Sequence, residues 1–154
     1  MFQGTEHEEK AKVIAGVTKD ISEILVELEL PDRAENDINV AYLSACSLQH
    51  GQQISNFPKD MLKKCGYKIS EPKNSHLCCG SAGTYNLLQP KISQELKNGK
   101  IQSLEAKKPD IIAAGNLGCM MQISSSTNIP VVHTVELIDW ATGGPKPNKL
   151  NDKH

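Results

Sequence analysis

The sequence predicts an α/β fold in which a small, mainly parallel sheet is flanked by helices and preceded by a long N-terminal helix. Two observations carry this prediction. From residue 38 to residue 141, short apolar runs rich in β-formers alternate with segments of helical character. The segments between these runs are long enough for the crossovers of about a dozen residues that parallel strands require.

Residues 7–29 have the pattern of one amphipathic helix, since apolar side chains recur every three, four or seven positions with Glu and Lys between them. The apolar members are Val13, Ile14, Val17, Ile21, Ile24, Leu25 and Leu28. Pro31 is expected to end this helix. We therefore expect residues 1–30 to pack as a helix on a domain at 31–142, and residues 143–154 to form a flexible tail.

The elements of this domain follow one another in the order strand, helix, strand. The expected strands are 38–43, 67–70, 110–114 and 130–133. The expected helices are 54–65, 84–107 with a new segment at Pro90, 120–126, and 135–141 capped by Thr134. Cys46 and Cys119 follow the first and third strands, at the carboxyl edge where α/β sheets form their sites.

Composition and charge exclude several classes of protein. The 17 basic and 18 acidic residues leave a net charge of −1, which argues against binding to nucleic acid. No apolar run approaches the roughly 20 residues of a membrane span. The first ten residues are polar and acidic, unlike a signal peptide, so a cytoplasmic location is expected. Five cysteines in a reducing compartment indicate metal or redox chemistry before disulfides.

Four of the five cysteines share a sequence context. Cys46, Cys78, Cys79 and Cys119 lie in turns that contain Gly or Ser, whereas Cys65 lies at a helix end and is expected to be structural. Four thiolates around one point suit Zn²⁺ or an iron–sulfur cluster. The spacing fits neither a zinc ribbon nor a bacterial ferredoxin. Spacing alone leaves a metal site and four redox-inert cysteines both open.

Other residues are candidates for the surroundings of these thiols. Adjacent Cys78 and Cys79 can reach one site only on a sharp turn, which Gly80 allows. His50 and His76 lie four residues after Cys46 and two before Cys78. We expect these histidines and Gly80 to lie beside the ligands, and His50, His76 and His133 to be hydrogen-bonded structural residues rather than ligands.

The pattern Cys46-x31-Cys78-Cys79-Gly80-x35-Asn116-x2-Cys119 resembles the cysteine-rich CCG domain. This domain occurs in heterodisulfide reductase and in the iron–sulfur subunit of glycolate oxidase, whose version the strings HLCCGSAGTY and GNLGC resemble most. The resemblance covers residues 5–142. It implies an iron–sulfur (4Fe-4S) cluster held by the four cysteines, which passes electrons from a flavin-containing partner that oxidises glycolate. It also implies a position at the inner membrane through partners.

Asn116 departs from the resemblance, because the fullest form of the motif has a cysteine there. A five-thiolate noncubane cluster is therefore not expected, and Asn116 is predicted to lie beside the sulfurs without ligating. No acid–base pair for a 2-hydroxy acid is visible, so we expect a non-catalytic electron-transfer subunit that corresponds to the C-terminal third of the larger protein. A zinc-stabilised assembly domain and a metal-free fragment are the alternatives.

Overall fold

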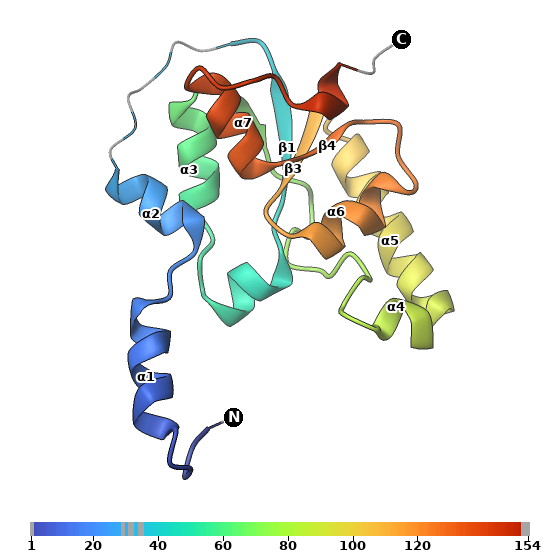
Figure 1. The fold of residues 1–154 in the computed structure, drawn as a ribbon. Helices are drawn as coiled ribbons and strands as arrows, with labels where there is room; N and C mark the ends of the chain where they lie inside the picture. Colours follow the sequence, from blue (N-terminus) through green and yellow to red (C-terminus); the bar gives the residue numbers. More distant parts are fainter. Residues whose placement is uncertain (1, 29, 31–32, 34–35, 152–154) are drawn as a thin grey trace. The chain divides into compact units, whose positions relative to one another are not determined.

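The computed structural model describes residues 2–28, 30, 33 and 36–151, in two compact units at 1–30 and 31–154. The first unit contains α1 (Glu8–Val17) and α2 (Ile21–Glu27) (Figure 1). The helix stop expected at Pro31 lies outside the described residues. The packing of the N-terminal segment on the second unit stays a prediction.

The continuous helix predicted over residues 7–29 is interrupted after Val17, which corrects that prediction. Asp20 starts a new helix with a capping box: its carboxylate accepts a hydrogen bond from the Ser22 backbone N–H at 2.9 Å. In return, the Glu23 carboxylate accepts from the Asp20 backbone N–H at 2.7 Å. These caps satisfy N–H groups that would otherwise lack partners at a helix start. Extended backbone at Thr18 separates the two helices.

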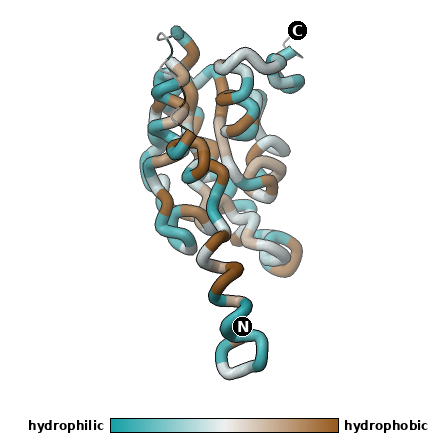
Figure 2. The backbone as a smooth tube through the Cα atoms, turned by 60° about the vertical axis from the view of Figure 1, so that its left-hand side comes forward, coloured by the Kyte–Doolittle hydropathy of each residue, from teal (hydrophilic) through white to brown (hydrophobic). Residues whose placement is uncertain are grey.

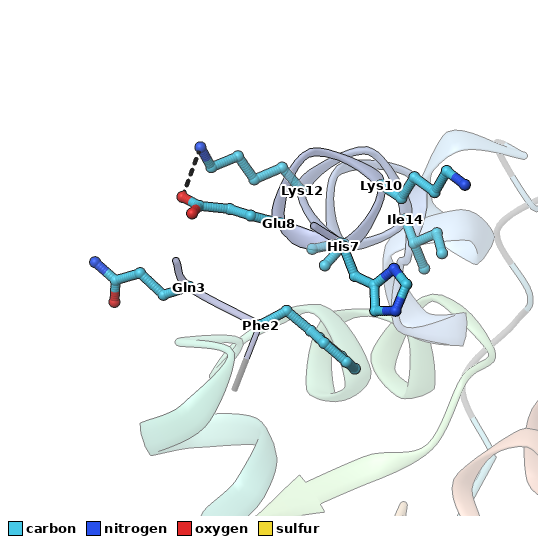
Figure 3. Close-up of a pocket in the computed structure, with 9 residues that line it drawn as sticks. Phe2, Gln3, His7, Glu8, Lys10, Lys12 and Ile14 are labelled. Carbon is cyan, nitrogen blue, oxygen red and sulfur yellow. Dashed lines mark ion pairs between the residues drawn. The ribbon is translucent and has the colours of Figure 1, made fainter. Parts of the chain in front are cut away.

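Within the first unit, α1 buries none of its residues. Val13, Ile14 and Val17 are exposed, and Figure 2 shows hydrophobic and hydrophilic stretches following one another along this part of the chain. A cavity of about 820 Å³ lies beside the helix, with Phe2, His7 and Ile14 among its lining residues (Figure 3). The apolar stripe read from the sequence is therefore present and unpartnered within this unit.

The second unit is built on the predicted sheet. Its strands are β1 (Asn39–Leu43), β2 (Lys68–Ser70), β3 (Ile111–Ala114) and β4 (Val131–His133). They pair in the order β2-β1-β3-β4, and every pair is parallel. The α/β class and the parallel sheet predicted from the sequence are thus confirmed.

Helices cover both faces of this sheet (Figure 1). On one face lie α3 (Phe57–Lys64) and α7 (Thr134–Ala141), and on the other α5 (Pro90–Glu105) and α6 (Leu117–Ser124), with the short α4 (Tyr85–Leu88) next to α5. The predicted cap of α7 is wrong by one residue. His133 caps it, since His133 Nδ1 accepts from the Val135 N–H at 3.2 Å.

Alternating side chains of the strands fill two apolar cores. Ala41, Leu43, Ile112 and Ala114 belong to the cluster that includes Leu104 and Ile123 of α5 and α6. Their neighbours Val40 and Tyr42 point to the opposite face and are also fully buried, as continuous apolar strands in a covered parallel sheet require. Tyr67 closes this second side, where its hydroxyl donates to the Leu137 carbonyl at 2.9 Å.

Two segments differ from the sequence-based expectations. A π-helical turn at Ser47–Gly51, here called η1, follows Cys46 and was not predicted. The segment expected to be a flexible tail contains a short 3₁₀ helix, η2 (Asn148–Leu150), and Leu150 is buried. The flexibility expected of residues 143–154 stays a prediction. Of the helices described, none is both long and apolar enough to cross a membrane.

Candidate metal centre

The parallel sheet brings four cysteines to its carboxyl edge. Cys46 follows β1, Cys78 and Cys79 lie in the loop after β2, and Cys119 is in the first turn of α6 after β3. Because parallel strands end at the same edge, these three connections converge. Cys65 precedes β2 and therefore lies at the opposite edge, where it is 2% exposed.

The loop before Cys78 is held by side chains from two other elements. Two come from η1: Gln49 donates to the Ser75 carbonyl at 3.4 Å, and His50 Nε2 lies 3.3 Å from the His76 carbonyl. From α5, Ser103 donates to the Lys73 carbonyl at 2.5 Å. Since η1 starts directly after Cys46, these contacts fix the Cys46 loop against the loop that carries Cys78.

A tight turn at Gly80 positions Cys78 and Cys79. Gly80 has φ +87°, and a Cβ atom there would lie 2.4 Å from the Ser93 carbonyl oxygen of α5. Buried Ser93 donates its hydroxyl to the Gly80 carbonyl at 2.8 Å and accepts from Gln122 of α6 at 2.9 Å. Glycine is thus required twice, for the positive φ and for the close approach of helix α5. The turn predicted at Gly80 is present.

The four thiols interact electrostatically with one another. Cys46 interacts with Cys78. Burial is the main cause that raises the pKa of Cys46, and the neighbouring Cys78 raises it further. The Cys119 thiol is hydrogen-bonded to the Cys79 sulfur, which lowers the pKa of Cys79 and raises that of Cys119. Backbone N–H groups of Cys79 and Ser81 also hydrogen-bond to the Cys79 sulfur, and the Gly80 N–H lies 3.3 Å from Cys78 Sγ.

A buried lysine faces these thiols and was missed by the sequence analysis. Lys100 of α5 is 4% exposed and interacts electrostatically with all four cysteines. Its ammonium donates to the Asn74 carbonyl at 3.1 Å and to the Ser75 carbonyl at 3.2 Å. Nothing in the string Asn98-Gly-Lys100 distinguishes this lysine from the solvated lysines of the same helix.

Asn116 has a clear structural role. Its side-chain oxygen caps α6 by accepting from the Cys119 backbone N–H at 3.1 Å. The amide therefore holds the backbone of a candidate ligand, and the prediction that Asn116 lies beside the sulfurs without ligating a metal stays a prediction. Of the three histidines considered, His133 caps α7 and His50 braces the Cys78 loop, while His76 is exposed and offers its carbonyl to His50.

The donor set fits a thiolate-bound metal group in its chemistry. Four soft sulfur donors, backbone N–H groups aimed at two of them and one buried cation are the surroundings that anionic metal–thiolate centres have. The thiols contact one another in pairs. Within the described ranges, no three Cys, His, Asp or Glu side chains already surround a single ion-sized point. The residues that would hold a metal group are Cys46, Cys78, Cys79 and Cys119.

The pattern of the CCG family, a cysteine-rich domain, matches residues 40–124, which span β1 to α6 and include all four of these cysteines. The chain belongs to the CCG cysteine-rich domain family. In this chain the CCG sequence forms the Gly80 turn, where the close approach of the Ser93 carbonyl leaves room only for glycine.

Several relatives of this CCG domain are iron–sulfur subunits. The chain is 34% identical over 134 residues to the glycolate oxidase iron–sulfur subunit of Escherichia coli, covering 86% of the chain and 33% of that protein. It is 29% identical over 149 residues to the probable glycolate oxidase iron–sulfur subunit of Bacillus subtilis, with coverages of 90% and 34%. Lactate utilization protein A of Geobacillus is 27% identical over 148 residues, with coverages of 90% and 62%. The chain thus spans about a third of the glycolate oxidase subunits that it matches.

Proposed function

We propose that this CCG domain is an iron–sulfur electron-transfer module. The cluster, of the 4Fe-4S type, would be held by Cys46, Cys78, Cys79 and Cys119. One observation carries the proposal: loops after three different strands bring four thiols together, in contacting pairs, beside a buried cation. When bound, such a cluster supplies reversible one-electron transfer. The chain's own residues hold the thiolates, donate backbone hydrogen bonds to sulfur and restrict access of water.

The partner follows from the relatives that are iron–sulfur subunits of glycolate oxidase. A 2-hydroxy acid loses two electrons on oxidation, whereas a cluster accepts them singly. A flavin-containing subunit can divide the pair, so it is the partner that the proposal requires. We place the module in the cytoplasm, where thiols stay reduced, and at the inner membrane through its partners.

Asn116 favours a second candidate function, a zinc-stabilised assembly domain. The side chain at this position caps α6 and supplies no fifth thiolate. Four thiolates are the complete ligand set of a structural zinc site. The zinc-bound domain would hold the same loops together, without redox activity.

Metal analysis under anaerobic conditions distinguishes the two functions. The protein is purified without oxygen, and iron, zinc and acid-labile sulfide are measured in one sample together with its visible spectrum. The electron-transfer proposal expects iron and sulfide in nearly equal amounts, and visible absorption that bleaches on reduction with dithionite. Stoichiometric zinc with a colourless protein would overturn it in favour of the assembly domain.

A further inference from the structure

Lys100 is the only buried charged side chain in the part of the chain that the structure describes. Burial of an ammonium group is costly unless partners compensate for the lost water. Burial accordingly lowers the pKa of Lys100, while the four cysteines act in the opposite direction. A buried ammonium needs compensating partners, and the four candidate ligands are among the groups that interact with it.

The hydrogen bonds of the Lys100 ammonium do not explain why a charged group is buried here. The Asn74 and Ser75 carbonyls accept two of its three N–H donors, which braces the loop before Cys78. A neutral donor such as an amide could provide this bracing at a smaller desolvation cost. The bracing alone therefore does not explain why the position holds a charge.

The charge has a counterpart on the thiol side. Four thiolates and their cluster carry net negative charge, and each added electron increases it. Lys73 and Glu95 line the 300 Å³ cavity between Cys78 and Lys100, but both are exposed to solvent, which screens their charges. Of these three charged residues, only Lys100 is buried.

We infer that Lys100 is a positioning residue of the cluster site: its buried positive charge raises the reduction potential by stabilising the reduced, more negative cluster. The inference rests on the proposed function and adds the residue that sets its electrochemistry. A unit charge within about 10 Å, at an effective dielectric constant of about 20, changes such an equilibrium by roughly tenfold. For a one-electron couple, tenfold corresponds to about 59 mV.

Lys100→Gln tests this directly, because the amide keeps a hydrogen-bond donor for the loop carbonyls and removes the charge. The readout is the midpoint potential of the anaerobically purified full chain, from a visible redox titration. We expect Lys100→Gln to lower the potential by about 59 mV, equal to a tenfold shift, and Lys100→Arg to stay close to wild type. Lys97→Gln is the matched control, since Lys97 lies one turn earlier on α5 and donates to Ser125 at 3.3 Å.

The outcomes separate the two proposals. Wild-type protein without iron and sulfide contradicts the proposed function itself. Loaded wild-type protein with an unchanged potential in Lys100→Gln contradicts only the charge assignment, and so does an equal shift in Lys97→Gln. If Lys100→Gln fails to take up iron, Lys100→Arg decides: normal iron content supports the charge, and loss of iron in both variants overturns it.

Discussion

Replacement of Gly80 by alanine tests the geometry of the CCG turn. The added Cβ would lie 2.4 Å from the Ser93 carbonyl oxygen, so the turn or helix α5 has to move by about 1 Å. Gly80 also has φ +87°, which costs a residue with a side chain about 1–2 kcal/mol. The forced movement adds about 1–3 kcal/mol. We expect Gly80→Ala to lower the free energy of unfolding by about 3 kcal/mol in total.

Gly83→Ala is the matched control, because Gly83 also has positive φ (+63°) but has open space around its Cβ position. This variant carries the backbone strain without the collision, so about 2 kcal/mol should separate the two. For a chain of this size, the melting temperatures followed by circular dichroism would differ by about 4–8 °C. Metal content should fall only in Gly80→Ala, since only that turn moves Cys78 and Cys79. Equal melting temperatures and equal metal contents in the two variants would refute the close-approach argument.

Three further predictions concern pH, the α6 cap and metal removal. Burial raises the pKa of Tyr67 to about 12, above its unfolded value near 10. The contribution of the protonated Tyr67 phenol to the free energy of unfolding is therefore complete below pH 10 and is lost as the pH rises from 10 to 12. Denaturant titrations should show a loss of about 2–3 kcal/mol over this range in wild type but not in Tyr67→Phe. Asn116→Ala should lose about 1 kcal/mol of stability while keeping its metal content. Asn116→Asp can still cap α6 and should melt like wild type. Loss of metal from Asn116→Ala would contradict a role confined to capping α6. Chelation should lower the melting temperature, because bound metal offsets repulsion among the thiolates; an unchanged melting curve after confirmed metal removal would indicate a metal-free scaffold.

The sheet could be predicted from sequence because its signals are local. Each strand is a short apolar run bounded by polar or turn residues, and the observed strands begin or end within about one residue of the predicted ones. The break before Asp20 was also readable, as Asp20 and Glu23 form a capping-box pattern that the longer apolar periodicity concealed. No comparable pattern in the sequence indicated that His133 caps α7, because the next residue, Thr134, is of a type that commonly caps helices and histidine is not.

The surroundings of the thiols depend on contacts between distant segments. Lys100 faces cysteines that lie 19 to 54 residues away in sequence, and no local pattern marks it as buried. The requirement for glycine at position 80 comes from Ser93 on another element. The π-helical turn after Cys46 likewise depends on hydrogen bonds to residues 75 and 76. The sequence motif identifies the four candidate ligands, and only the fold identifies what surrounds them.

The most direct test of the central claim is the iron and acid-labile sulfide content of single Cys→Ser variants. Cys46, Cys78, Cys79 and Cys119 should each lose most of both when replaced by serine, because each supplies one thiolate. Cys65→Ser should keep wild-type amounts, since Cys65 is buried at the opposite edge of the sheet. Full iron and sulfide in any two of the four variants, or their loss in Cys65→Ser, would contradict the proposed ligand set.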